Sequence, residues 1–210
     1  SSPADGTTFT SSSVPFSWGT SSDSSSGSGF KNYTLQVATD SSFSSLVVND
    51  TGLTGTSATK TLSANGTYYW RVLAYDNNGN STVSTPSSRT FVRQTPQVTG
   101  LSWRNGTSSG ASVVSTIEAG STVYARVDAV GMNGQTVTVP VYEYDPISAN
   151  DFVANISVTI GASGYGTTAW TAKWVDDGLS VGDKDDEMIL TYSGVANSAQ
   201  MTVRDTPGPS

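Results

Sequence analysis

The sequence predicts an all-β protein made of two tandem β-sandwiches. Apolar residues alternate with polar ones in short runs, and no helical periodicity occurs. Gly, Asn, Ser and Asp separate these runs at the spacing of sandwich strands. The charge also divides the chain, because residues 1–96 are neutral while residues 97–210 carry the whole net charge of -7. This asymmetry indicates two units with different surfaces.

The composition excludes several function classes. The 210 residues include neither His nor Cys, which removes Ser–His and Cys–His catalysis, thiol chemistry and disulfides. The acidic balance disfavours nucleic acid as a partner. No apolar stretch reaches 18 residues, so no membrane insertion is expected. We therefore expect no enzyme and no cofactor other than calcium.

In the first half, the strands are predicted by alternating apolar side chains. These fall at 14–18, 33–37, 43–48, 68–74 and 90–92. The segment 20–29 contains no apolar residue before Phe30 and predicts a loop, while Asn77–Asn80 reads Asn-Asn-Gly-Asn and predicts a turn.

Four segments of the first half follow one another in a recognisable order: "VPFSW" (14–18), "YTLQVATDSSFSSLV" (33–47), "LSANGTYYWRVLAYDNNGNST" (62–82) and "SSRTFVR" (87–93). Through these segments, residues 1–93 resemble a bacterial fibronectin type III domain. This resemblance implies that Trp18 is the core tryptophan of the second strand. It also implies that Tyr68 forms a tyrosine corner, with its hydroxyl bonded to the backbone near the preceding turn. The proline that the family places before this corner is replaced by Ala64.

The second half begins after a linker at residues 94–96, where Pro96 cannot donate to a strand ladder. Alternation predicts strands around 98–103, 113–117, 123–129, 137–141, 152–160, 167–175, 186–193 and 198–204. Asn133-Gly134 predicts a tight hairpin between two of them. Residues 206–210 have the composition of a linker tail.

Residues 97–205 resemble a bacterial immunoglobulin-like domain of surface proteins and wall enzymes. The segment "AGSTVYARVDAVGMNGQTVTVPVYEYD" carries this resemblance, together with the number of strands in about 110 residues. The resemblance brings no binding residues with it.

Two tryptophans are candidates for stacking on carbohydrate. Trp170 and Trp174 fall on one face of a predicted strand, and a row of flat apolar rings matches the C–H face of a pyranose. The alternative is core packing, because sandwiches place large aromatic side chains between their sheets.

An acidic cluster near the C-terminus is a candidate calcium site. Asp176, Asp177, Asp183 and Asp185 lie close together in sequence and offer the hard oxygen ligands that calcium prefers. The spacing is not that of an EF-hand, and the alternative is a solvated loop. Separately, Glu143 follows the register of Val137, Val139 and Val141, which indicates either a buried carboxylate or a strand that has left the core.

Two further features concern the surface. Six asparagines fit the glycosylation pattern: Asn32, Asn49, Asn65, Asn80, Asn105 and Asn155. The first dozen residues are rich in Ser and Thr and have two interpretations: a flexible terminus, or a strand added to a neighbouring subunit. The glycines of "GASGYG" (161–166) predict a turn rather than a phosphate cradle.

These observations favour a secreted or cell-surface module without catalytic activity. It would act as a spacer or adhesion unit, or help an attached domain to hold a polysaccharide. One alternative is a subunit of an extracellular filament, surface layer or virion decoration, with the chain itself as partner. A second alternative is a carbohydrate-binding domain that uses Trp170 and Trp174.

Overall fold

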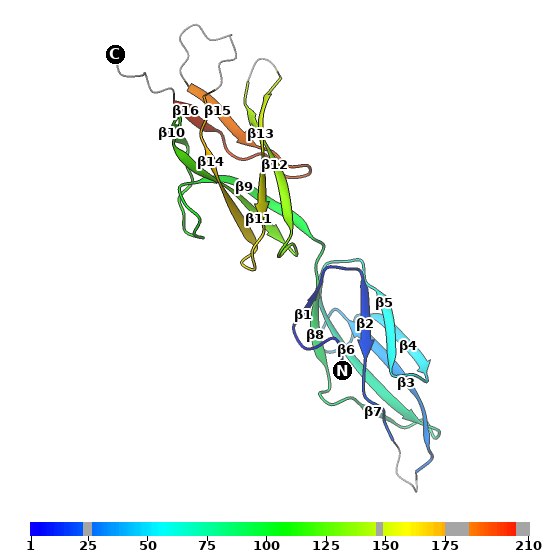
Figure 1. The fold of residues 1–210 in the computed structure, drawn as a ribbon. Helices are drawn as coiled ribbons and strands as arrows, with labels where there is room; N and C mark the ends of the chain where they lie inside the picture. Colours follow the sequence, from blue (N-terminus) through cyan, green and yellow to red (C-terminus); the bar gives the residue numbers. More distant parts are fainter. Residues whose placement is uncertain (23–26, 146–148, 175–184, 205–210) are drawn as a thin grey trace, which may run out of the picture. The chain divides into compact units, whose positions relative to one another are not determined.

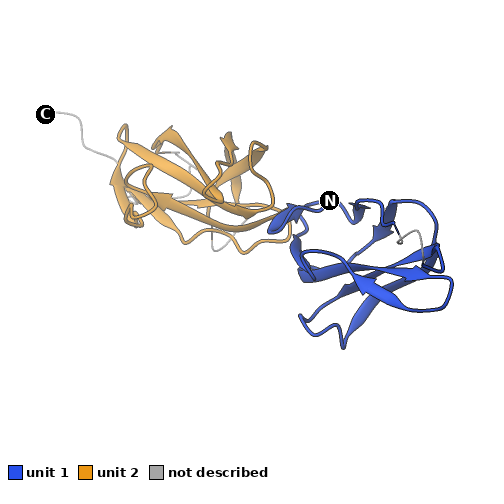
Figure 2. Cartoon of the chain, turned by 90° about the horizontal axis from the view of Figure 1, so that it is seen from below, with its two compact units in different colours: residues 1–95 blue, residues 96–210 orange. Residues whose placement is uncertain are grey.

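The computed structural model describes residues 1–22, 27–145, 149–174 and 185–204. These residues divide into two compact units, Ser1–Thr95 and Pro96–Ser210, and each is built from β-strands (Figures 1 and 2). The prediction of an all-β sandwich fold is confirmed. The part of the chain that the structure describes contains no helix able to cross a membrane.

Unit 1 is a sandwich of one large sheet and one small sheet (Figure 1). The large sheet has the order β1-β8-β6-β3-β4, with β7 also paired to β6, and the small sheet contains only β2 and β5. The strands are β1 (Thr7–Phe9), β2 (Ser13–Ser17), β3 (Phe30–Ala38), β4 (Leu46–Leu53), β5 (Ser57–Thr61), β6 (Gly66–Asp76), β7 (Ser81–Val83) and β8 (Arg89–Arg93).

The core of unit 1 is a cluster of aromatic side chains between these sheets. Phe91 on β8 is fully buried and contacts three rings, those of Phe9, Phe16 and Tyr68, at centroid distances of 5.8, 5.7 and 5.4 Å. Phe16 also contacts Trp70, with 5.4 Å between the ring centroids. Alternation along the strands therefore turns these rings from both sheets toward the space between them.

The predicted tyrosine corner is present. The hydroxyl of Tyr68 donates a hydrogen bond of 2.9 Å to the carbonyl oxygen of Ala64, four residues earlier. Trp18 differs from its predicted role, because β2 ends at Ser17 and the indole is only partly buried at the edge of the core. Phe16 occupies the central position instead, since it is the last inward-facing residue within the strand.

The N-terminal segment is folded onto its own unit. β1 pairs in parallel with β8, and Ser2 forms an isolated bridge to Ser17. The carboxylate of Asp5 accepts hydrogen bonds of 2.7 Å from both the backbone N–H and the hydroxyl of Thr90. These bonds occupy the edge of β8, so residues 7–9 are not a free strand in this structure.

The turn between β3 and β4 is organised by Asp40. Its carboxylate accepts backbone N–H bonds from Ser42, Ser44 and Ser45 at 3.0, 3.1 and 2.7 Å, and it also accepts the Ser42 hydroxyl. These donors favour the charged form and hold the pKa of Asp40 well below its usual value of 3.8, with the Ser42 hydroxyl contributing most.

Replacing Asp40 with asparagine is expected to give a pH-dependent loss of stability. Since the pKa of Asp40 is lower in the folded state, its contribution is complete above the usual value of 3.8 and declines as the pH falls below it. Melting temperatures of wild type and Asp40→Asn at pH 7, 4, 3 and 2 check this. The gap between the two proteins should narrow with acidity, and a constant gap would contradict the assignment.

Unit 2 is a second sandwich, with sheets of five and three strands (Figure 1). The five-stranded sheet has the order β10-β16-β15-β12-β13 and the other the order β14-β11-β9. The strands are β9 (Gln97–Arg104), β10 (Thr116–Glu118), β11 (Thr122–Val130), β12 (Thr136–Glu143), β13 (Asp151–Thr159), β14 (Tyr165–Thr171), β15 (Asp185–Leu190) and β16 (Met201–Arg204).

Trp103 links the two sheets of unit 2. Its ring lies 5.2 Å from that of Trp170 and is almost completely buried. The indole Nε1 donates a hydrogen bond of 3.2 Å to the carbonyl oxygen of Met188 on β15, which belongs to the opposite sheet. Trp103 therefore fills part of the core with its ring and also joins the two sheets through the hydrogen bond of its indole N–H.

The hairpin predicted at Asn133-Gly134 is wrong. β11 and β12, which flank this turn, belong to different sheets and are not paired. Only Gly134 of the two residues has a positive φ, of 77°, and the N–H of Gln135 bonds to the carbonyl of Met132 at 2.9 Å. A positive φ at the third residue is typical of a type II turn, which here carries the chain from one sheet to the other.

Candidate functional site

The candidate site is a groove in unit 1 where the small sheet ends. Two strands, β2 and β5, cover the inner face of a six-stranded sheet and leave part of it open. Alternate residues of β6 follow this face from the core outward: Trp70 and Val72 are buried, while Ala74 and Asp76 are only partly buried. The floor of the groove is thus a continuation of the core face beyond its cover.

Three hollows that share lining residues make up this groove. The first, of about 270 Å³, is lined by Ser21, Ser22, Phe30, Ala74, Tyr75, Asp76, Asn80 and Thr82. The second, of about 230 Å³, shares Ser21, Ala74 and Thr82 with the first and adds Trp18, Tyr33 and residues 83–85 among others. Because adjacent hollows share walls, the groove is continuous.

The third hollow lies where the edge of β6 changes partner. β6 pairs with β7 up to Val83 and with β8 from Arg89, and the N–H of Ser84 still bonds to the carbonyl of Val72 at 2.8 Å, so residues 85–88 leave the ladder. Trp18, Trp70, Pro86 and Arg89 line the small space of about 20 Å³ next to this excursion. It connects to the second hollow through Trp18 and Val72, which line both.

An aromatic row forms one side of the groove. The rings of Trp18 and Tyr33 have centroids 5.7 Å apart, and those of Tyr33 and Phe30 have centroids 4.6 Å apart. The Tyr33 hydroxyl also accepts a hydrogen bond of 2.6 Å from the backbone N–H of Ser21. This bond fixes the segment after β2 against the row.

The opposite wall is held by short-range hydrogen bonds. Asp76 accepts the backbone N–H and the side-chain Nδ2 of Asn80, both at 2.8 Å, at the turn into β7. The Asn80 side chain lowers the pKa of Asp76 more than any other group. Ser84 donates its hydroxyl to the carbonyl of Pro86 at 3.1 Å. The groove therefore has walls that are positioned before any ligand binds.

The fold of unit 1 and its alternating core agree with the comparison with known families. Residues 4–91 form an immunoglobulin-like domain. They match the family model described as the Rha78A-like, N-terminal immunoglobulin domain. A search of curated proteins found no match to the chain.

This result places the predicted first domain in the wider immunoglobulin-like class. The narrower fibronectin type III assignment of residues 1–93 stays a prediction. The groove belongs to the immunoglobulin-like domain, because its lining residues from Phe30 to Arg89 lie within the matched range.

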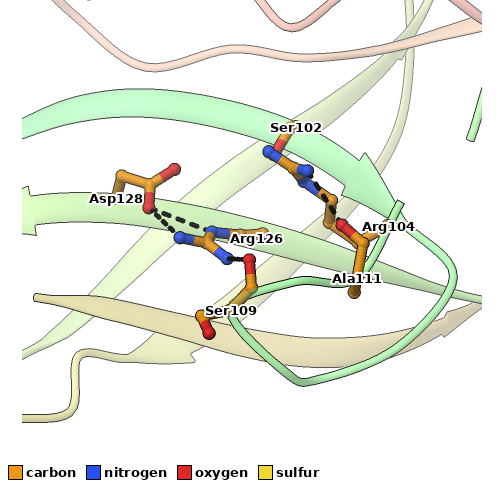
Figure 3. A network of polar contacts seen from close by, with 6 residues as sticks. All are labelled: Ser102, Arg104, Ser109, Ala111, Arg126 and Asp128. Atoms are coloured by element: carbon orange, nitrogen blue, oxygen red, sulfur yellow. Dashed lines mark hydrogen bonds and ion pairs between the residues drawn. The ribbon is translucent and has the colours of Figure 1, made fainter. Parts of the chain in front are cut away.

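Two arginines of unit 2 hold the loop between β9 and β10 (Figure 3). Arg126 donates from Nε and Nη2 to Asp128 Oδ1 at 2.9 and 2.7 Å, and from Nη1 to the carbonyl of Ser109 at 3.2 Å. Its guanidinium also lies 4.0 Å from the ring centroid of Tyr165. Arg104 donates to the carbonyl of Ala111 at 2.9 Å. These contacts engage both guanidinium groups structurally.

Replacing Arg126 with lysine is expected to lower the free energy of unfolding of unit 2 by about 1–2 kcal/mol. Lysine can neither donate two hydrogen bonds to Asp128 from a planar group nor stack on the ring of Tyr165. Urea unfolding measures this loss, and amide exchange should accelerate in residues 105–113. Arg204→Lys is the matched control, since Arg204 pairs with Asp185 at 3.8 Å on the surface. Equal stability of Arg126→Lys and wild type would contradict the role.

The two tryptophans proposed for carbohydrate stacking do not form one platform. Trp170 is only 8% exposed and packs against Trp103, so the prediction that it offers a face to a sugar is corrected to core packing. Trp174 is 36% exposed and lies after the end of β14. Its binding to carbohydrate stays a prediction.

Most of the predicted calcium site lies outside the described residues. Asp176, Asp177 and Asp183 belong to this part of the chain, while Asp185 begins β15 opposite Arg204. Within the residues that the structure describes, no three acidic side chains gather as a metal site would require. Glu143 is buried on the inward face of β12, so the alternative that the strand has left the core is wrong.

The six glycosylation candidates differ in exposure. Five of them are exposed, namely Asn49, Asn65, Asn80, Asn105 and Asn155, whereas Asn32 is partly buried within β3. The side-chain oxygen of Asn65 accepts two bonds from Thr95, and the side-chain nitrogen of Asn80 donates to Asp76. Modification at any of these positions stays a prediction.

Sequence reasoning did not find the groove. It assigned Trp18 to the core and gave no role to residues 83–86. The available signal was the composition of β5, whose one apolar residue is Ala58, because a strand with so little apolar surface forms only a narrow cover for the sheet.

Proposed function

We propose that the chain is a non-catalytic, extracellular accessory region of a protein that acts on or holds a polysaccharide. The single observation that carries this proposal is the match of residues 4–91 to the Rha78A-like immunoglobulin domain, a rhamnosidase-associated family. The absence of His and Cys supports a role in binding or spacing rather than catalysis, because it removes the commonest nucleophile–base pairs.

The Ser- and Thr-rich composition supports the same role. Low charge and many hydroxyl groups suit a surface that works beside neutral, hydrated polymers. The groove of unit 1 adds a place where such a polymer can bind, since it combines aromatic rings with hydroxyl and amide groups.

Affinity electrophoresis with a parallel assay for reducing ends tests this proposal. The chain is run through gels that contain a neutral polysaccharide such as xylan, glucomannan, arabinogalactan or a rhamnan, and through a gel without polymer. We expect retardation by at least one polymer and no release of reducing ends from any of them. Free migration in every gel, or release of reducing ends, would overturn the proposal.

A second candidate function is self-assembly into an extracellular filament or layer. It is favoured by exposed apolar side chains on two edge strands, Leu46 and Val47 on β4 and Phe152 on β13. Open edges with apolar side chains can pair with further copies of a chain. Light scattering at increasing protein concentration separates the candidates, because an accessory region stays monomeric while a subunit grows.

A further inference from the structure

We propose that the groove of unit 1 is a binding site for a neutral oligosaccharide, with the indole N–H groups of Trp18 and Trp70 as hydrogen-bond donors to the sugar. This inference deepens the proposed function and rests on it, since it names the site and the ligand class. It concerns the immunoglobulin-like domain and uses none of the tryptophans of unit 2.

The indole N–H groups of Trp18 and Trp70 are buried donors in unit 1. Both Nε1 atoms are buried and have no hydrogen-bond partner within the part of the chain that the structure describes. Trp70 is only 3% exposed, and both side chains line the third hollow. An indole N–H can only donate, so a ligand that satisfies these groups must supply acceptor oxygens.

Trp103 of unit 2 differs from these two tryptophans, because its buried indole N–H has a partner. Trp103 is also buried, yet its Nε1 donates to the carbonyl of Met188 at 3.2 Å. The chain thus satisfies a buried indole where the core requires it. Buried donors without a partner carry a cost. Arg93 also has buried nitrogens without a partner among the described residues, but the two indole donors differ from it because both side chains line a hollow of the groove.

The groove is lined by both apolar and polar groups. The partly buried rings of Trp18 and Phe30 supply flat apolar surface, which suits the C–H faces of pyranose units, while Tyr33 is buried and packs against both rings. Ser21, Ser22, Thr82, Ser84, Thr85 and Asn80 supply hydroxyl and amide groups along the walls. A pyranose ring likewise has apolar C–H groups on its faces and hydroxyl groups around its edge, so the two surfaces match.

The groove contains charged groups of both signs in equal number. The groove contains one carboxylate, Asp76, in the first hollow and one guanidinium, Arg89, in the third. Asp76 accepts two hydrogen bonds from Asn80, and Arg89 donates from Nη1 to the carbonyl oxygen of Ser1 at 3.4 Å. With no excess of either sign, the groove favours a neutral ligand over a uronic acid or a phosphorylated one.

The experiment is a titration of the whole ¹⁵N-labelled chain, followed through its five tryptophan indole N–H resonances. The probes are xylohexaose, cellohexaose, mannohexaose and a rhamnose hexasaccharide, with hexagalacturonate as the charged comparison. We expect at least one neutral probe to shift the resonances of Trp18 and Trp70 toward the hydrogen-bonded range. The Trp103 resonance should stay in place, because this indole is already bonded.

Variants make the test specific. Trp18→Phe keeps an aromatic ring but removes the donor, and we expect it to weaken binding about tenfold. Ala74→Trp fills the first two hollows without removing a donor and should abolish binding. Trp174→Phe is the matched control, since it makes the same substitution at an exposed tryptophan outside the groove and should bind like wild type.

The outcomes separate this inference from the proposed function. Retardation of the chain by a polysaccharide, with unchanged Trp18 and Trp70 resonances, would overturn the groove and leave the accessory role standing. Shifts caused by hexagalacturonate alone would overturn the neutral saccharide as ligand. Loss of binding in Trp174→Phe but not in Trp18→Phe would move the site to unit 2 and also overturn the inference.

Discussion

Replacing Trp103 with alanine is expected to lower the free energy of unfolding of unit 2 by about 3–5 kcal/mol. The side chain is 1% exposed, packs against Trp170 and carries the hydrogen bond to Met188 that joins the two sheets. Alanine leaves a large cavity and an unsatisfied carbonyl group in the core. Urea unfolding followed by near-ultraviolet circular dichroism measures the loss.

Two further variants define this result. Trp103→Phe should lose less stability than alanine, because the ring remains while the donor to Met188 is absent. Trp174→Ala is the matched control at an exposed tryptophan and should stay within about 0.5 kcal/mol of wild type. A Trp103→Ala variant as stable as this control would show that Trp103 does not link the sheets.

Replacing Phe91 with alanine is expected to cost unit 1 a similar amount, about 3–5 kcal/mol. Phe91 is fully buried and contacts the rings of Phe9, Phe16 and Tyr68, which come from β1, β2 and β6. Its removal therefore weakens contacts on both sheets at once. Thermal unfolding of the whole chain measures the effect on the unit 1 transition.

Phe152→Ala is the matched control for this prediction. Phe152 is 58% exposed on the edge strand β13, so its truncation should change stability by less than about 0.5 kcal/mol. If Phe91→Ala and Phe152→Ala were equally stable, Phe91 could not be the centre of the unit 1 core.

The strands with clear alternation were predictable from the sequence. β11 buries valine and alanine in turn at every second position, and β12 buries Val137, Val139 and Val141 in the same way; such a two-residue period specifies which face turns inward. Tyr68 and its bond to Ala64 were predictable through a resemblance, since a tyrosine corner has a recognisable spacing. The short strands β5 and β7 have no apolar side chain larger than valine, and β1 has a single large one, Phe9, so all three depend on pairing with neighbours that the sequence does not reveal.

Features that depend on which strands share a sheet were not predictable. Asn133-Gly134 favours a hairpin locally, but tertiary packing assigns its two strands to opposite sheets. Trp170 alternates like a surface row, yet its ring packs against Trp103 from another strand. The groove arises because a two-stranded sheet covers a larger one incompletely, which is a property of topology and not of any local motif.

Differential scanning calorimetry of the whole chain, with and without a neutral hexasaccharide, shows whether unit 1 binds the sugar. Each unit has its own core, so we expect two transitions, assigned by Phe91→Ala for unit 1 and Trp103→Ala for unit 2. A ligand stabilises only the unit that binds it, by about 2.7 kcal/mol at a hundredfold excess over its Kd. The account predicts that the saccharide that retards the chain in gels raises the unit 1 transition alone. A rise in the unit 2 transition, or no rise in either, would contradict it.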